Sequence, residues 1–178
     1  MYPNHKSPSY GVFVSNFAQS FQGGGNQIVL KSLIKGRKKG IGKIFKYIWF
    51  FMDVFWKSNF GSYELIYVHY MQHSLLPLKF WWKRGTRKLV LNAHGTDIMG
   101  SGRIADFLRK FNKATVLQAD LVVVPSSFFV PKLRQMDVNK EKIFVSPSGG
   151  IDPKNFYVGV RNELNMKIGY LGRLDPGK

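Results

Sequence analysis

Short, continuously apolar runs alternate with longer amphipathic segments over most of the chain after residue 62. The apolar runs predict strands at residues 64–69, 88–93, 121–124 and 143–145. The segments between them have the three- and four-residue apolar spacing of helices, which predicts helices at residues 75–82, 104–119 and 130–136. Strands that are apolar on both faces and alternate with helices are typical of a parallel sheet covered on both sides. The predicted fold class is therefore α/β, with a doubly wound parallel sheet.

The first sixty residues give a less regular pattern. Residues 12–21 have helical spacing, residues 27–34 predict a strand, and residues 41–56 predict a helix that is apolar on nearly every side. That helix is too short and too charged to predict a membrane span. Because a chain rarely opens with a loop that leads into a helix, we expect the first strand of the fold to lie before Met1 and to be missing from the chain.

The loops that follow the strands are the places to look for chemistry, because ligands of doubly wound sheets bind beyond the carboxyl ends of the strands. The loop after residues 88–93 begins with His94 and Gly95. An imidazole in this position can hydrogen-bond a substrate or assist proton movement, and the glycine would let a ligand approach the backbone. A structural role for His94 is the alternative, because one histidine on a loop is weak evidence by itself.

Two later segments carry further information. Ser126 follows the strand at 121–124, where its hydroxyl is expected to cap a helix start. A turn rich in glycine and proline spans 146–152, and a fresh apolar strand follows at 167–171. This change predicts a domain boundary, with a first domain at 1–152, a linker at 153–165 and the start of a second domain at 166–178.

Basic residues dominate the composition, with 27 Lys and Arg against 10 Asp and Glu and a formal net charge of +17. Such an excess attracts polyanions, which include nucleic acids, anionic lipid headgroups and phosphorylated small molecules. Arg173 and Lys178, just past the strand at 167–171, could clamp a phosphate, the arginine through two hydrogen bonds and the lysine as a point charge. Composition alone does not choose among these ligands, and a basic surface that only favours solubility is a further alternative.

Several segments occur in the order and at the spacings typical of glycosyltransferase family four. They are residues 94–97, 119–126, 145–152 with Phe156, 169–174, and Lys178. The opening residues 2–14 also look like the first loop and helix of that family. The resemblance covers nearly the whole chain, which is similar to the amino-terminal half of these enzymes.

The resemblance implies two Rossmann-like domains that face each other across a cleft, the GT-B arrangement. The first domain would receive the acceptor and the second the nucleotide sugar, and the sugar would be transferred with retention of its anomeric configuration. The expected function is thus the acceptor-side domain of a retaining glycosyltransferase that acts in cell-surface polysaccharide or glycolipid synthesis. Its partners would be a nucleotide sugar, a saccharide or lipid-linked acceptor, and the second domain of the same protein.

The resemblance also implies roles for individual residues. His94 would be the catalytic residue, in contact with the transferred sugar, while Arg173 and Lys178 would neutralise the donor diphosphate as it leaves. Contacts to substrate or donor are expected at Gly11, Gly95, Thr96, Asp97, Ser126, Gly149, Arg173 and Lys178. Neither a metal nor a cofactor besides the nucleotide sugar is expected, because those two cations take over the electrostatic role of a metal.

Three features depart from the family pattern. The first strand is absent, and residues 148–150 replace a shorter asparagine-glycine turn. The acidic pair that binds the donor in the second domain of these enzymes would lie beyond Lys178. The chain by itself is therefore expected to be inactive.

A basic and aromatic segment suggests contact with a membrane surface. Its seven cations are Lys31, Lys35, Arg37, Lys38, Lys39, Lys43 and Lys46. The apolar helix at 41–56 overlaps the end of this run, and residues 81–84 repeat the combination of tryptophan with basic side chains, as interfacial anchors do. We expect an anionic membrane surface as a partner, and the alternative is that this helix belongs to the layer that covers the sheet.

The remaining evidence concerns location and competing functions. The chain has no cysteine and no secretory signal after Met1, so we expect a cytoplasmic protein, with peripheral association on the inner membrane face. A nucleic-acid-binding module is one alternative, since exposed aromatics could stack on bases, and a non-catalytic scaffold on an anionic membrane is another. The nucleic-acid alternative leaves the glycosyltransferase motifs unexplained.

Overall fold

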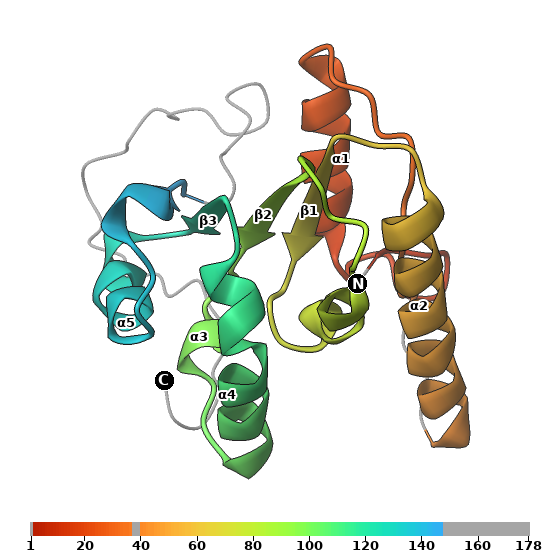
Figure 1. Ribbon diagram of the computed structural model, residues 1–178. Coiled ribbons are helices and arrows are strands. Elements are labelled where there is room, and N and C mark those ends of the chain that lie inside the picture. The colour runs from red at the N-terminus through yellow and green to blue at the C-terminus, as the bar shows by residue number, and fades with distance from the viewer. Residues whose placement is uncertain (1, 37–39, 148–178) are drawn as a thin grey trace, which may run out of the picture.

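A computed structural model describes residues 2–36 and 40–147 of the chain (Figure 1). These residues form a parallel sheet with the strand order β1-β2-β3-β4. The strands are β1 (Leu65–His69), β2 (Lys88–Asn92), β3 (Leu121–Val124) and β4 (Ile143–Val145). The predicted α/β class and the four strands predicted between residues 64 and 145 are confirmed, with ends that differ by at most one residue. The strand predicted at 167–171, the linker at 153–165 and the second domain at 166–178 lie outside the described residues.

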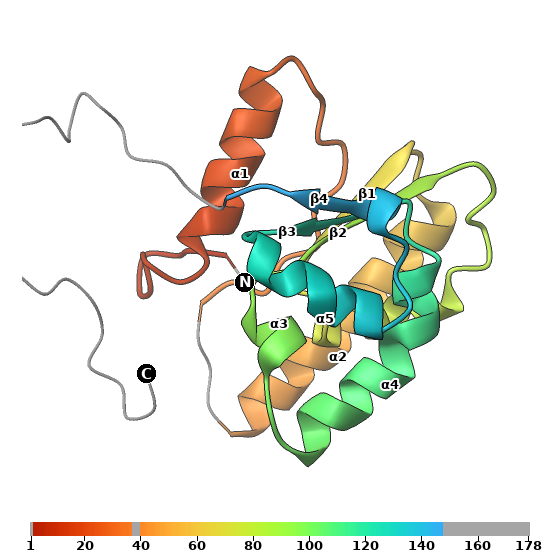
Figure 2. The same ribbon diagram turned by 90° about the vertical axis from the view of Figure 1, so that its left-hand side faces the viewer.

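Helices flank the sheet on both sides, which is the Rossmann-like arrangement. The α-helices of the described residues are α1 (Val12–Gly23), α2 (Ile41–Phe60), α3 (Thr96–Met99), α4 (Arg103–Leu117) and α5 (Val130–Gln135). In Figure 2, α1 lies on one side of the sheet, and α2, α4 and α5 lie on the other. Three shorter 3-10 helices complete the described elements: η1 (His73–Phe80), η2 (Ser127–Phe129) and η3 (Lys140–Lys142).

Two of the predicted elements differ in the structure. The helix predicted at 75–82 is the 3-10 helix η1, and Pro77 within it lacks the N–H that an α-helix needs at that point. The strand predicted at 27–34 is wrong, because those residues run without ladder hydrogen bonds to any described strand. Their β-branched and apolar side chains favour extended backbone, but a strand also needs a neighbour about 4.8 Å away to pair with.

The hydrophobic core lies between β2, β3 and the layer that contains η1 and α4. Its fully buried side chains are Leu75, Leu89, Leu91, Val122, Val124 and Leu133. Each such side chain contributes roughly 1.5–3 kcal/mol by leaving water. By contrast Leu65 at the start of β1 remains 40% exposed, although Val68 of the same strand is buried and belongs to the core.

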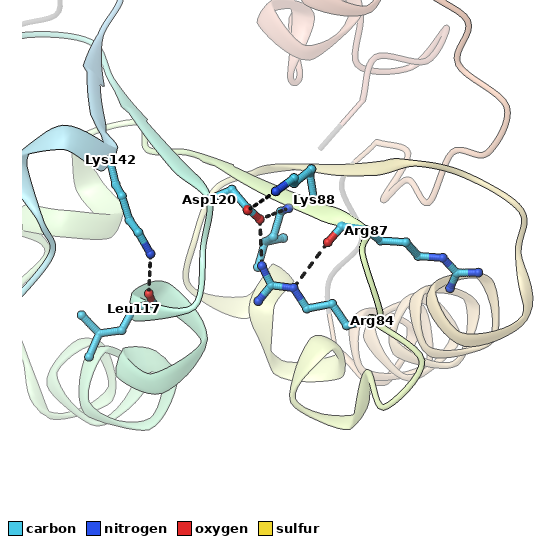
Figure 3. Close-up of polar contacts among 7 residues, drawn as sticks. Arg84, Arg87, Lys88, Leu117, Asp120 and Lys142 are labelled. Carbon is cyan, nitrogen blue, oxygen red and sulfur yellow. Dashed lines mark hydrogen bonds and ion pairs between the residues drawn. The ribbon is translucent and has the colours of Figure 1, made fainter.

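Asp120 fastens the amino ends of β2 and β3 together (Figure 3). Its carboxylate accepts hydrogen bonds from Nη2 of Arg84 at 2.7 Å, from Nζ of Lys88 at 3.1 Å and from the backbone N–H of Leu89 at 2.9 Å. A carboxylate that satisfies a backbone N–H and two cations stabilises more than an isolated surface ion pair. This cluster lies at the opposite end of the strands from the candidate site, so its role is structural.

Asp120→Asn is therefore expected to lower the free energy of unfolding by about 1–2 kcal/mol, since it removes the charge from three hydrogen bonds. The matched control is Asp137→Asn, because the side chain of Asp137 makes only an exposed ion pair, with Lys113, among the contacts of the described residues. Asparagine also tolerates the positive φ of 68° at position 137. Urea denaturation measures both variants, and equal losses would contradict the special role of Asp120.

Candidate functional site

Two histidines meet at the carboxyl edge of the sheet. His69 ends β1 opposite Asn92 of β2, and His94 follows two residues after Asn92. Nδ1 of His69 lies 3.3 Å from Nε2 of His94, so a single hydrogen bond links the two imidazoles. His94 is half-buried, and its placement at the carboxyl edge of a parallel sheet agrees with the sequence prediction.

The first turn of α1 covers this histidine pair. The ring of Phe13 lies 4.5 Å from that of His94, and the ring of Phe17 lies 4.8 Å from that of His69. Gly11 starts the helix with φ of 73°, a left-handed conformation that most other residues adopt only with strain. Gly11 is thus two residues from Phe13, whose ring lies against His94, and the contact of Gly11 with substrate or donor stays a prediction.

Asp97 holds two loops together through hydrogen bonds to their backbones. Its Oδ1 accepts a hydrogen bond from the backbone N–H of His94 at 2.9 Å, and its Oδ2 accepts one from the backbone N–H of Met71 at 3.0 Å. The residue is only 3% exposed. Asp97 therefore ties the loop after β2 to the loop after β1 and positions His94, whereas the sequence suggested a direct contact with substrate.

The other predicted site residues of the described chain lie near the same edge of the sheet, and their contacts with substrate or donor stay predictions. Gly95 has φ of 85°, and a Cβ there would lie 3.1 Å from the ring of Phe129, so glycine permits close packing. Thr96 is exposed at the start of α3. Oγ of Ser126 accepts a hydrogen bond from the N–H of Phe128 at 3.1 Å, which is the helix cap that the sequence predicted.

Three predicted donor contacts, at Gly149, Arg173 and Lys178, lie outside the described residues. The described part of the site is consequently one stretch of the carboxyl edge of the sheet: the histidine pair, the Gly11 turn beside it and the loop that Asp97 holds. Any contribution of the donor side stays a prediction from the resemblance.

Burial sets the charge state of the histidine pair. Burial, and to a smaller extent the charge that His94 would carry, lower the pKa of His69 to about 4. Burial also lowers the pKa of His94, although Asp97 opposes that shift. Both rings are therefore neutral near pH 7, and each can use one nitrogen as a donor and the other as an acceptor.

His69 is the functional candidate that the sequence analysis missed. It was placed as the last residue of a strand and given no chemistry. The signal was present, because consecutive strands of such sheets are usually neighbours, and a histidine that ends one strand then faces the loop after the next. Phe13 and Phe17, whose rings cover the histidine pair, carry no such signal in the sequence, because aromatic residues in helices are ordinary core residues.

Acidification is expected to destabilise the protein through His69. The unfolded chain binds a proton as the pH falls below 6.5, whereas folded His69 binds one only near pH 4. The stability that neutral His69 provides is therefore present above pH 6.5 and lost as the pH falls toward 4, on the order of 3 kcal/mol. Urea denaturation at pH 7, 5.5 and 4.5 measures this loss.

The matched variants for that experiment are His69→Gln and His5→Gln, since His5 is exposed. The first should reduce the dependence of stability on pH between 6.5 and 4 and leave the part due to His73 and His94, whose pKa values burial also lowers. The second should leave the dependence as in the unmodified chain. A dependence that is as large in His69→Gln as in the unmodified chain would contradict the assignment of the largest share to this ring.

A second surface of interest is the exposed side of α2, which we call the α2 face. Phe50 and Val54 of α2 pack toward the core. On the opposite side of the helix, exposed apolar side chains recur about every three or four residues. They are Ile41, Phe45, Ile48, Trp49, Met52, Trp56 and Phe60. Trp49 is 77% exposed. Nζ of Lys83 lies 4.6 Å above the ring of Phe60, so basic and aromatic groups adjoin here.

None of the helices in residues 2–36 and 40–147 is both long and apolar enough to cross a bilayer. The α2 face and the histidine pair are thus the two surfaces from which function can be argued. Comparisons of the chain with models of protein families, with curated proteins and with solved structures found no match.

Proposed function

We propose that this chain is the acceptor-side domain of a retaining glycosyltransferase of the GT-B type. The observation that supports it best is the neutral His94, linked to His69 at the carboxyl edge of a parallel sheet and covered by the Gly11 turn. In doubly wound sheets this edge is where ligands bind. Residues 1–152 would form the acceptor-side domain, and residues 166–178 would begin the donor domain.

His94 would contact the transferred sugar with the nitrogen that His69 leaves free. Since Nε2 of His94 is engaged by Nδ1 of His69, the free nitrogen is Nδ1. The bond from the anomeric carbon to the donor phosphate breaks, a bond to the acceptor hydroxyl forms on the same face, and the acceptor proton passes to the departing phosphate. A neutral, fixed imidazole can orient a sugar hydroxyl at that carbon without placing a cation beside the positive charge that develops there.

The remaining residues would support this arrangement. Asp97 fixes the backbone of His94, and His69 selects the nitrogen of His94 that carries the proton. Arg173 and Lys178 would neutralise the leaving diphosphate, which is why no metal is required in this proposal. The substrates would be a nucleotide sugar and a saccharide or lipid-linked acceptor used in cell-surface polysaccharide or glycolipid synthesis.

The partner that we propose besides these substrates is an anionic membrane surface. The α2 face supports it, because α2 buries only Phe50, Ser58 and Asn59 fully while it exposes a stripe of large apolar side chains. The stripe adjoins Lys83, and Lys43 is exposed near the start of the same helix, the pattern of a helix that lies in the headgroup region. Such a position would bring the carboxyl edge of the sheet to a lipid-linked acceptor.

The test of the enzymatic proposal is a transfer assay of the full-length protein with a panel of nucleotide sugars and lipid-linked or saccharide acceptors. Release of nucleoside diphosphate that depends on one donor and one acceptor class supports it. A protein that turns over no donor in the panel and binds oligonucleotides tightly at 0.15 M salt would instead support the nucleic-acid alternative.

A further inference from the structure

The loop that leaves β1 starts in an unfavourable backbone conformation. Tyr70, the residue after His69, has φ of 68°, which lies in the left-handed region that bulky side chains rarely adopt. Its N–H donates to the carbonyl of Asn92 at 3.0 Å, so the strained residue directly continues the pairing of β1 with β2. Such strain persists only where the surrounding structure holds it. The bonds made by the next two residues therefore decide how the chain leaves His69.

Asn112 of α4 holds the carbonyls of those two residues. Its Nδ2 donates to the carbonyl of Gln72 at 2.7 Å and to the carbonyl of Met71 at 3.3 Å. Asn112 is only 2% exposed, and its Oδ1 has no hydrogen-bond partner among the described residues. A buried amide costs free energy wherever it is not hydrogen-bonded. The useful part of this side chain is therefore its pair of N–H groups, which bind the β1 loop.

A series of hydrogen bonds continues from this loop to His94. The N–H of Met71 donates to Oδ2 of Asp97 at 3.0 Å, and Oδ1 of Asp97 accepts from the N–H of His94 at 2.9 Å. Asn112 is thus linked through residue 71 and Asp97 to the backbone of His94. It is also linked to His69, which lies two residues before Met71. The series fixes the backbone on both sides of the histidine pair, whose ring nitrogens lie 3.3 Å apart.

Arg109, about one turn earlier on α4, holds the loop on the other side. Its Nη1 donates to the carbonyls of Ile98, at 3.3 Å, and of Gly100. Residues three apart in a helix lie on the same face, so Arg109 and Asn112 act from one side of α4. Arg109 binds the end of α3, whereas Asn112 binds the β1 loop. A change at Asn112 therefore tests the support of the β1 loop separately.

We propose that Asn112 is a positioning residue for the histidine pair. By holding the carbonyls of residues 71 and 72, it keeps Tyr70 in its strained conformation and so fixes the hydrogen bond between His69 and His94. Without these two donors Tyr70 relaxes, the backbone of His69 turns, and its ring moves away from His94. The proton of His94 is then no longer confined to one nitrogen. Only the consequence for sugar transfer rests on the proposed function; the effect on the two rings does not.

The test changes Asn112 to leucine, which has a similar branched shape without the donors. Nitrogen NMR of the histidine rings at pH 7 shows which nitrogen carries the proton. We expect one tautomer at His69 and at His94 in the unmodified chain and a mixture of tautomers at both in Asn112→Leu. In the full-length enzyme the rate of sugar transfer should fall by up to about 10²-fold with little change in KM for the donor, because a displacement of about 1 Å has an effect of that size.

Three further variants separate positioning from a loss of stability. Tyr70→Gly relieves the strain, since glycine adopts a φ of 68° readily, so adding Asn112→Leu to it should change the rings less than Asn112→Leu alone. Asn112→Ser keeps one donor and should give a smaller change of the same kind. Leu89→Ala is the control, because Leu89 is 1% exposed in the amino-terminal half of β2, away from the carboxyl edge. It should lower the thermal midpoint and leave both rings unchanged.

Several results would overturn the proposal. They are unchanged ring signals in folded Asn112→Leu and Asn112→Ser, an equal effect of Asn112→Leu with and without Tyr70→Gly, an equal change in Leu89→Ala, and mixed tautomers already in the unmodified chain. The transfer assay reports on the enzymatic proposal separately. If the rings change as expected but the unmodified enzyme transfers no sugar, or transfers it equally fast with Asn112→Leu, the positioning role of Asn112 stands and the proposed role of His94 in transfer fails.

Discussion

Replacement of His94 by alanine in the full-length enzyme is expected to lower the rate of sugar transfer by about 10²-fold or more, while the thermal midpoint changes little. Groups that act on protons or orient reacting atoms typically contribute about 10²–10⁴ in rate. His94 is half-buried at the edge of the sheet, and the fully buried core residues do not include it. The ring is therefore expected to matter for the transition state more than for packing.

The matched control is His73→Ala, because the ring of His73 packs against Tyr47 of α2 at 5.6 Å and belongs to a different cluster. Transfer rate and thermal midpoint are measured for both variants with the same donor and acceptor. His94→Gln is a third arm, since an amide can restore one hydrogen bond, and we expect it to recover part of the lost rate. Wild-type turnover in His94→Ala, or equal losses of turnover and stability in both histidine variants, would return His94 to a structural role.

The strands after residue 62 could be predicted because burial on both faces leaves a direct mark in the sequence. Residues 121–124 and 143–145 are continuous apolar runs between helical segments, and each forms a strand with those limits. Since the strands are parallel and follow one another in order, the loops after them meet at one edge. The position of His94 at that edge followed from this pattern alone.

The strand predicted at 27–34 failed for a reason that no local pattern contains. Its composition favours extended backbone, and the structure does leave it without helix. A ladder, however, depends on a neighbour at the right distance, and a hollow lined by both segments separates these residues from β1. Strand propensity is a property of a segment, whereas strand pairing is a property of two.

The roles of His69 and Asp97 could not be predicted for a related reason. His69 acquires its role from the register of β1 against β2, which brings its ring to 3.3 Å from His94. Asp97 was expected beside a ligand, but its carboxylate accepts two backbone N–H groups from separate loops. Side-chain partners that lie 25 or more residues apart depend on tertiary geometry, which a list of loop residues does not specify.

The chain is expected to bind vesicles that contain acidic lipid, and raising the salt concentration should weaken most of that binding. Each basic side chain near an anionic surface adds about 1 kcal/mol, so changing the exposed Lys31, Lys35 and Lys43 to Gln should weaken binding about 10²-fold. Salt at 0.1 M screens charge attraction beyond about 10 Å, so high salt should remove most of the electrostatic binding. The binding that remains at high salt would be due to insertion of apolar side chains.

That salt-resistant part should depend on the α2 face. Trp49→Ser with Trp56→Ser is expected to abolish it, because both indoles are exposed on the stripe and indoles favour the headgroup region. Phe144→Ser is the matched control, since Phe144 is 55% exposed on β4, at the other edge of the sheet from α2. Co-sedimentation with acidic and neutral vesicles at 0.05 and 0.5 M salt measures every variant. Two results would contradict the membrane proposal: vesicle binding that neither the lysine nor the tryptophan changes alter, or no binding to acidic vesicles at all. The α2 face would then bind a different partner, and the acceptor would not have to be lipid-linked.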